Sequence, residues 1–336
     1  MVHDLASNAH ISHVDKVIVY DLLSQRTNNA MKYPLFSAFL CSGFGFVSGQ
    51  TGRPNNIVVT NDDGWATAQI RAQFDALEAA GFNLILSCPA INRSGTGSST
   101  APPTTLTAPC EFNTCATGSP PEGSDPEDPR LNYVNSFPVD SVRFGIQTLS
   151  PQFFGGLPDF VVSGPNVGTN LGPNINGSGT VGAACEAALE GIPSAAFSAS
   201  TASQISFTTL TTDPDSALSI SARIYADLTT TFTTTLLAAG RPVLPPGISV
   251  NVNFSPTPNC LSAGAFRFVP TRIAANNNVI DAPVCATEHL PAERGVVTGP
   301  GCFVSVSVMN AASKGDVDAA TQAIVFEKLS PILTCF

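Results

Sequence analysis

The chain has 336 residues, of which 43% are hydrophobic and only 12% are charged. This composition suits a buried core and excludes general disorder, and the length allows one large domain or two ordinary ones. The formal net charge of −10 argues against a nucleic-acid polymer as a partner, because that binding depends on Lys and Arg.

The first fifty residues predict a processed leader. Residues 1–30 show no helical or strand period, whereas an apolar stretch begins after Met31-Lys32 and ends at Ser48-Gly49. A basic start, a short apolar core and a small-residue end are typical of a signal peptide, and the stretch is too short to cross a membrane. A buried helix is the alternative, which the glycines and serines of the stretch disfavour. We therefore expect residues 1–30 to be a gene-model extension, residues 31–49 a signal peptide and residues 50–336 a single secreted domain with no membrane contact after cleavage.

The cysteines agree with secretion. Of nine, Cys41 lies in the predicted signal peptide, which leaves the even number expected in an oxidising compartment. Cys110 and Cys115 are close enough in sequence for a small local loop, and no spacing indicates zinc. Cys185 lies on the apolar face of a predicted helix and is the expected free thiol. His289 is the one histidine after the leader, so a histidine-based mechanism would have only that side chain.

Hydrophobic periodicity predicts alternating strands and helices in the rest of the chain. A strand, a helix and a second strand follow one another as a βαβ unit, so the sheet is expected to be parallel. Residues 87–135 are rich in Pro, Gly, Ser and Thr and predict a long surface excursion. The expected elements are strand 57–60, helix 66–80, strand 84–86, helix 141–149, strand 160–162, glycine-rich loop 164–179, helix 181–189, strand 195–197, helix 213–237, strands 248–254 and 303–308, and helix 316–328.

Three polar segments follow predicted strands. They are Asn61-Asp62-Asp63-Gly64, then Pro89-Ala90-Ile91-Asn92-Arg93-Ser94-Gly95, and finally the segment 163–172 with Ser178-Gly179-Thr180 after it. Open α/β sheets bind their ligands at the carboxyl ends of the strands. All three segments can therefore converge on one crevice.

The adjacent carboxylates Asp62 and Asp63 carry the chemistry of this crevice. Two neighbouring side chains at a turn can both reach one hard cation, which prefers oxygen ligands. The N-terminus of a following helix attracts anions, so the pattern predicts a divalent cation facing a phosphate. The alternative is that Asp62 is only a helix N-cap and Asp63 only a turn former.

Together these segments resemble the SurE (survival protein E) family of metal-dependent phosphatases, which act on nucleoside monophosphates and other phosphomonoesters. The similarity runs over residues 55–310, and the leader and cysteines place it nearest an extracellular, acid-phosphatase-type branch. The resemblance implies a three-layer, doubly wound (Rossmann-like) α/β fold with a mostly parallel sheet and an extended C-terminal hairpin region. It also implies a homodimer or homotetramer.

The resemblance assigns the metal ligands to Asp62, Asp63, Ser94 and Asn166, with Asp62 and Asp63 as the catalytic residues. Such oxygen donors suit Mg²⁺, Mn²⁺ or Ca²⁺. A bound cation polarises a phosphoryl oxygen and lowers the pKa of a bound water. Two alternatives stay open: Asn166 as a left-handed turn residue and Ser94 as a helix cap.

The same resemblance makes Asn92, Gly179 and Thr180 the candidates for binding the substrate phosphate. Arg93 is either a phosphate clamp or a salt-bridged or solvated side chain. Trp65 stands where the family often has a polar stretch; it either stacks on a leaving group or packs in the core, and packing is favoured.

We therefore expect a secreted phosphoric monoester hydrolase of the acid phosphatase or 5′-nucleotidase type. Its expected substrates are nucleoside 5′- or 3′-monophosphates or general acid-phosphatase substrates, hydrolysed by a metal-activated water. The alternative is a secreted, non-catalytic protein that binds a metal and an anion on the same fold. A dinucleotide oxidoreductase is disfavoured, because the first strand–helix turn carries Asp-Asp-Gly rather than G-x-G-x-x-G.

Overall fold

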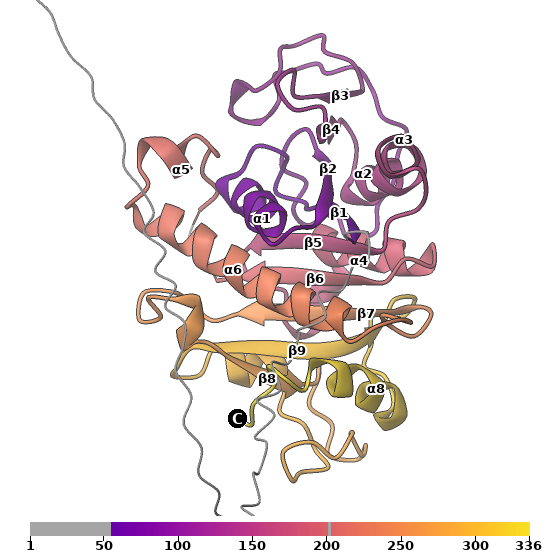
Figure 1. Cartoon of the computed structure of the whole chain (residues 1–336), viewed down its shortest axis with the longest axis vertical. Coiled ribbons are helices and arrows are strands. Elements are labelled where there is room, and N and C mark those ends of the chain that lie inside the picture. Colours follow the sequence, from indigo (N-terminus) through magenta and orange to yellow (C-terminus); the bar gives the residue numbers. More distant parts are fainter. Residues whose placement is uncertain (1–54, 201–202) are drawn as a thin grey trace, which may run out of the picture. The chain divides into compact units, whose positions relative to one another are not determined.

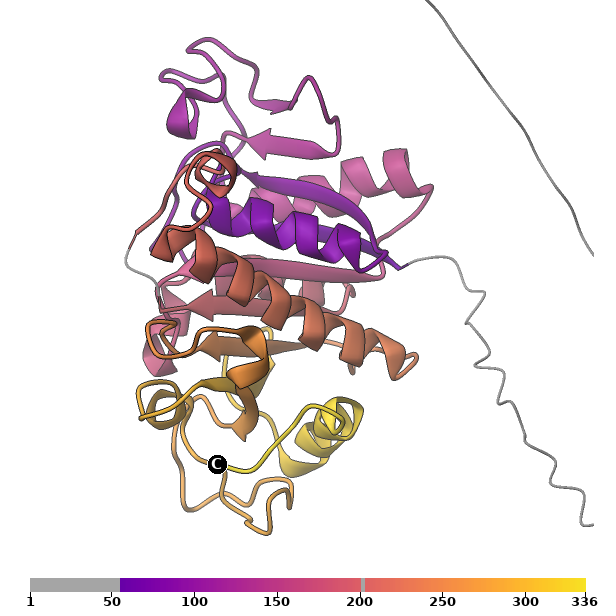
Figure 2. The same cartoon turned by 60° about the vertical axis from the view of Figure 1, so that its left-hand side comes forward.

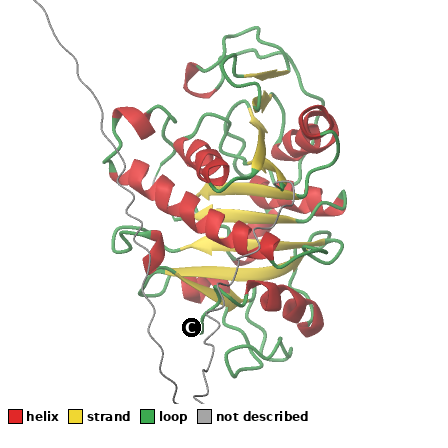
Figure 3. Ribbon diagram, in the orientation of Figure 1, coloured by secondary structure: helices red, strands yellow, loops and turns green. Residues whose placement is uncertain are grey.

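Nine strands form one mixed sheet in the computed structural model, which describes residues 55–200 and 203–336 (Figures 1 and 3). The strand order is β3-β4-β2-β1-β5-β6-β7-β9-β8. The strands are β1 (Asn56–Thr60), β2 (Asn83–Pro89), β3 (Glu122–Ser124), β4 (Leu131–Val134), β5 (Phe160–Val167), β6 (Ser194–Ala199), β7 (Ile248–Phe254), β8 (Arg267–Thr271) and β9 (Phe303–Asn310).

The sheet is parallel through its centre and reverses its winding beside β1. Strands β4, β2, β1, β5, β6 and β7 are mutually parallel, whereas β3 and β9 run antiparallel to their neighbours β4 and β7. The chain moves from β1 outwards to β2 and β4, and then returns to place β5 on the other side of β1. This is a topological switch point, where doubly wound sheets leave a crevice beyond the carboxyl ends of the two strands.

Helices cover both faces of the sheet, which gives three layers (Figure 2). α1 and α6 lie side by side on one face, and α2 and α4 pack together on the other. Buried aliphatic side chains of β1 and β5 meet those of α2 and α4, because parallel strands are apolar on both faces. The helices are α1 (Ala68–Ala79), α2 (Pro138–Phe144), α3 (Ser150–Phe154), α4 (Gly179–Leu189), α5 (Thr209–Thr212), α6 (Ala217–Ala238), α7 (Glu293–Val297) and α8 (Ala319–Leu329).

The predicted three-layer, doubly wound, mostly parallel fold is confirmed. In the C-terminal half, β7 and β9 form an antiparallel pair with seven paired positions, from Ile248↔Asn310 to Phe254↔Val304. The connection between them is long and contributes β8 and α7, so the two strands do not form a tight hairpin.

Three local predictions are corrected. The long helix begins at Ala217, because Ser216 accepts the Ser219 N–H at 3.3 Å, and Asp213-Pro214 therefore does not open it. The surface excursion 87–135 adds β3 and β4 to the edge of the sheet. The helix predicted over 141–149 runs from 138 to 154 and is interrupted by a π-helical turn.

Six of the eight cysteines beyond the predicted leader form disulfides: Cys110–Cys115, Cys260–Cys302 and Cys285–Cys335. The local Cys110–Cys115 loop and the free, buried Cys185 are as predicted, whereas the free Cys88, buried in β2, was not predicted. Burial raises the pKa of the Cys185 thiol to about 12 and that of Cys88 further still. Both are therefore inert as nucleophiles at neutral pH.

The predicted gene-model extension, signal peptide and cleavage before Gln50 lie outside the described residues. The described residues, 55–200 and 203–336, fall in one compact unit. Within residues 55–200 and 203–336, no helix is both long enough and apolar enough to cross a bilayer.

Candidate active site

The turn after β1 is built by Asn61. Its amide donates to the Gly64 carbonyl at 2.9 Å, and its Oδ1 accepts from the Gly64 N–H at 3.2 Å. The next helix, α1, begins only at Ala68, with Thr67 in the N-cap position. Asp62 is therefore not the N-cap of that helix, and the turn-forming role lies with Asn61. Both aspartates are left to make other contacts.

Asp62 lies against the N-terminus of α4 rather than that of α1. The Thr180 hydroxyl donates to Asp62 Oδ1 at 2.5 Å, and the backbone N–H groups of Gly179 and Thr180 also stabilise the carboxylate. Gly179 is needed here, because a Cβ at that position would lie 2.8 Å from both Asp62 Cβ and Pro138 Cγ. Burial outweighs these hydrogen bonds and raises the pKa of Asp62.

The Asp63 carboxylate accepts hydrogen bonds from three other segments of the chain. The Val167 N–H donates to its Oδ2 at 2.6 Å, the Ser94 hydroxyl donates to its Oδ1 at 3.3 Å, and the Gln204 amide donates to the same oxygen. Burial first, and then the charge of Asp62, raise the pKa of Asp63 to about 7. The site thus holds two buried carboxylates that repel each other.

The second and third polar segments meet this pair. The Arg93 N–H donates to the Asp62 carbonyl at 2.7 Å, which fixes the 89–95 segment against the first turn. The pairing of β5 with β6 shifts register between Ser163 and Asn166, just beyond the last pair of β5 with β1, Thr60↔Ser163, and such bulges commonly redirect a side chain. A hollow of about 520 Å³ lies here, lined by Asp62, Ser94, Gly95, the loop 166–170 and residues 173, 174, 177 and 178.

These residues fit a hard cation. The Asn166 amide nitrogen donates to the Gly168 carbonyl at 2.7 Å, so its Oδ1 is the atom left to accept or ligate. A positive charge would relieve the repulsion that raises the Asp63 pKa. Among the described residues, no three His, Cys, Asp or Glu side chains are grouped to hold a metal. A cation would therefore also need neutral oxygens, such as those of Ser94 and Asn166.

The predicted phosphate-binding residues take different places. Thr180 and Gly179 are buried and contact Asp62, at the helix end that would face an anion. Asn92 is exposed and accepts the Ser94 N–H at 2.8 Å, while its amide donates to Gln204 at 3.2 Å. Asn92 therefore orients the loop that carries Ser94.

Two residues at the site were not predicted. Gln204 lies in the loop after β6 and links Asp63 to Asn92. Glu111 lies over Gly64, where a Cβ would come 2.1 Å from its Oε2, and that oxygen is buried without a partner. Burial and then the charge of Asp63 raise the pKa of Glu111 to about 8. The position of Gln204 beyond a strand end was a usable signal, whereas nothing in the sequence around Glu111 indicated its role.

The open alternative for Trp65 is resolved towards packing, whereas Arg93 makes a contact with an aromatic ring that neither of its alternatives described. The Arg93 guanidinium lies 5.5 Å from the centre of the Phe137 ring. Trp65 is 2% exposed and packs 5.3 Å from Tyr133, centre to centre. His289 contacts the carbonyl of Val279 in the segment after β8 and does not join the aspartates.

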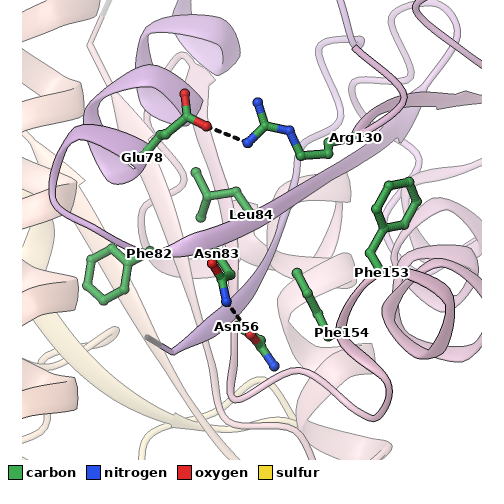
Figure 4. A pocket seen from close by; sticks show the side chains of 8 residues that line it. All are labelled: Asn56, Glu78, Phe82, Asn83, Leu84, Arg130, Phe153 and Phe154. Carbon is green, nitrogen blue, oxygen red and sulfur yellow. Dashed lines mark hydrogen bonds and ion pairs between the residues drawn. The ribbon is translucent and has the colours of Figure 1, made fainter. Parts of the chain in front are cut away.

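A second hollow, of about 450 Å³, lies at the opposite end of the sheet (Figure 4). It is lined by the first residues of β1 and β2, Asn56 and Asn83, whose side chains hydrogen-bond to each other. Glu78 and Arg130 form an ion pair across it. Its polar groups are thus engaged with one another, and it lies at the amino ends of the strands, away from the edge where such sheets bind ligands.

The fold and the site define a doubly wound α/β protein with a hollow lined by carboxylate, hydroxyl and amide groups at its switch point. The chain belongs to the SurE family, because the family model described as Survival protein SurE matches residues 57–277.

Named relatives agree with this membership. The chain is 33% identical to an acid phosphatase of Yarrowia lipolytica over 290 residues, which cover 76% of this chain and 78% of the relative. It is 37% identical to the 5′-nucleotidase SurE of Synechocystis over 145 residues, so there it spans only 47% of the relative's length. The crystal structure of the SurE protein from Aquifex aeolicus shares the fold, with a TM-score of 0.50 at 24% identity over 82% of this chain and 99% of that one.

Proposed function

We propose that this protein is a phosphoric monoester hydrolase that depends on a divalent cation. The observation that carries the proposal is the buried pair Asp62 and Asp63 at the switch point, in contact with Ser94 and next to Asn166. Membership of a family whose named relatives are an acid phosphatase and 5′-nucleotidases supports the reaction class.

The four proposed ligands are Asp62, Asp63, Ser94 and Asn166. When bound, Mg²⁺, Mn²⁺ or Ca²⁺ supplies Lewis-acid polarisation of a phosphoryl oxygen and activates a water for attack. The protein's part is positioning and electrostatic stabilisation, because phosphoryl transfer puts most charge on the phosphoryl oxygens. The loops of Ser94 and Asn166 are held by hydrogen bonds to Asp62 and Asp63, so the donors are preorganised around the hollow.

The substrate phosphate is proposed to bind beside the N-terminus of α4, where Gly179 and Thr180 lie, with Asn92 holding the adjacent loop. The hollow there is wide enough for a small phosphomonoester. Nucleoside monophosphates and simple aryl or alkyl phosphates are the proposed substrates.

Hydrolysis of a panel of nucleoside 5′- and 3′-monophosphates and one aryl phosphate tests the proposal, with and without EDTA and with Mn²⁺, Mg²⁺ or Ca²⁺ restored. Turnover that EDTA abolishes and a divalent cation restores is expected. Cation binding without turnover on any of these substrates would favour the non-catalytic alternative. Turnover that EDTA leaves unchanged would refute metal dependence.

We also propose secretion, supported by three disulfides, which persist in oxidising compartments. N-terminal sequencing of the exported protein is expected to begin near Gln50, and residues 1–30 still attached would refute the proposed processing. Assembly as a homodimer or homotetramer, proposed on the family resemblance, is tested by light scattering.

A further inference from the structure

Glu293 is a buried carboxylate outside the segment that the family model matches. It is the first residue of α7, its exposed fraction is 0%, and it lies beyond residue 277. Burying a charged group is costly unless hydrogen bonds compensate it. A carboxylate in this position therefore needs an explanation from its contacts.

Three neutral donors occupy the two oxygens of Glu293. Oε1 accepts the Gly172 N–H at 2.6 Å, while Oε2 accepts the Asn251 amide at 2.9 Å and the Ser307 hydroxyl at 3.0 Å. Asn251 and Ser307 are directly paired across β7 and β9, which lie side by side in the sheet (Figure 1). Glu293 thus ties the backbone of the site loop to the face of the sheet beneath it.

The same face of β7 holds the middle of that loop. The amides of Asn251 and Asn253 both donate to the Asn170 carbonyl, at 3.0 and 3.1 Å. Asn170 in turn donates its N–H to Asn253 at 2.8 Å and its side-chain amide to Ser198 at 2.8 Å. Asn251 Oδ1 is buried without a partner, whereas the other groups named here are hydrogen-bonded. A buried network in which most members are satisfied favours one arrangement of the loop.

The loop held in this way is the one that lines the hollow. It begins at Asn166, a proposed metal ligand, and ends at Gly172, the partner of Glu293. Arg294, next to Glu293, adds a hydrogen bond to the Leu171 carbonyl at 3.1 Å. The packing of the segment 293–297 does not require a carboxylate, because the buried Val296 and Val297 supply its apolar face.

We propose that Glu293 is a positioning residue for the active-site loop 166–172, holding Asn166 and the wall of the hollow in place through Gly172 and Asn251. The inference rests on the proposed function, because the loop matters for chemistry only if Asn166 serves the cation. Removal of an outer hydrogen-bonding partner of a metal site commonly lowers metal affinity or activity by about 10- to 100-fold.

The test compares Glu293→Ala and Glu293→Gln with Glu288→Gln, which replaces an exposed glutamate in the nearby segment before α7. Gln keeps the size of the side chain and one acceptor oxygen but turns an N–H₂ towards groups that are themselves donors. We expect hydrogen exchange in the 166–178 peptide to be about tenfold faster in Glu293→Ala, with a smaller increase in Glu293→Gln. We expect Mn²⁺ affinity to fall in the same order by about 10-fold or more.

A merely structural role would lower the melting temperature without a selective change at this loop. The inference would therefore be overturned if a folded Glu293 variant shows the wild-type rate of hydrogen exchange in residues 166–178. It would also be overturned if folded Glu293→Gln binds Mn²⁺ with wild-type affinity. If Glu293→Ala does not fold, Glu293→Gln gives the answer. If the wild-type protein itself hydrolyses no phosphomonoester, the proposed function fails, while the exchange measurement still decides the role of Glu293.

Discussion

Replacing Asp63 by Asn tests whether Asp63 holds a metal ion or only forms a structural turn. The pKa of Asp63 is raised from 3.8 to about 7 by burial and by Asp62. A group whose pKa is higher in the folded state binds its proton more tightly there, so the stability it confers is present below pH 3.8 and is lost as the pH rises through 7. Above this range, the ionised Asp63 therefore destabilises the metal-free protein.

The size of this effect follows from the shift. About three pKa units at about 1.4 kcal/mol each correspond to about 4 kcal/mol above about pH 7. An asparagine side chain cannot ionise and so removes this penalty, but its amide satisfies the donors of Asp63 less well, which costs about 1–2 kcal/mol. The metal-free Asp63→Asn protein should therefore be more stable than wild type at about pH 8, by about 2 kcal/mol.

Turnover should change in the opposite direction. Loss of a carboxylate that holds the cation should lower kcat by at least about 100-fold, as for other losses of electrostatic stabilisation in a transition state. Mn²⁺ should raise the melting temperature of wild type much more than that of the variant.

Three measurements are needed: thermal melts at about pH 8 with EDTA, the same melts with Mn²⁺, and kinetics on an aryl phosphate. Asp62→Asn should lower kcat by a similar factor. Wild-type turnover with wild-type EDTA sensitivity in both variants would refute the metal assignment.

Three further predictions concern two residues beside this pair and the buried Glu293. Glu111→Gln should weaken Mn²⁺ binding severalfold at about pH 9, because the wild-type carboxyl, with its pKa of about 8, is ionised there and attracts the cation. At about pH 6 the substitution should have little effect on Mn²⁺ binding. Equal effects at both pH values in calorimetric titrations would contradict this prediction. Gly179→Ala should cost about 1–3 kcal/mol of stability and lower kcat, because the new Cβ would press on Asp62, whereas Gly264→Ala, in open space, should do neither in the same melts and assays. Because burial raises the pKa of Glu293 from 4.5 to about 7, its carboxyl destabilises the fold progressively as the pH rises between those values. Glu293→Gln should remove up to about 3 kcal/mol of that pH dependence of the unfolding free energy. Urea unfolding that gives parallel curves of stability against pH for variant and wild type would argue against the raised pKa.

The fold was predictable because its signals are local. The apolar runs of β1 and β5 and the βαβ spacing are properties of short windows, and they indicated a parallel doubly wound sheet. The register of β4 against β2 was not predictable, since it depends on where a Pro- and Gly-rich excursion returns to the sheet. The start of α6 was missed for a related reason, because Asp213 and Ser216 are both acceptable N-caps and only tertiary packing selects one.

The site was predictable where its residues lie next to one another in sequence and unpredictable where the fold brings distant residues together. Asp62, Asp63 and Ser94 belong to motifs at strand ends. Gln204 has only its position beyond a strand end as a signal, and Glu111 comes from a loop with no comparable pattern.

The alternating apolar and polar residues of β7 show most clearly what could not be predicted from the sequence. Polar residues at every second position, such as Asn251 and Asn253, ordinarily indicate a face turned to water, yet both are completely buried. The reason lies in a segment about 80 residues earlier, the loop with Asn170 whose backbone groups these amides satisfy. A strand face that looks solvent-exposed in sequence thus supports the loop that lines the hollow, and Glu293 adds a further hydrogen bond to that loop.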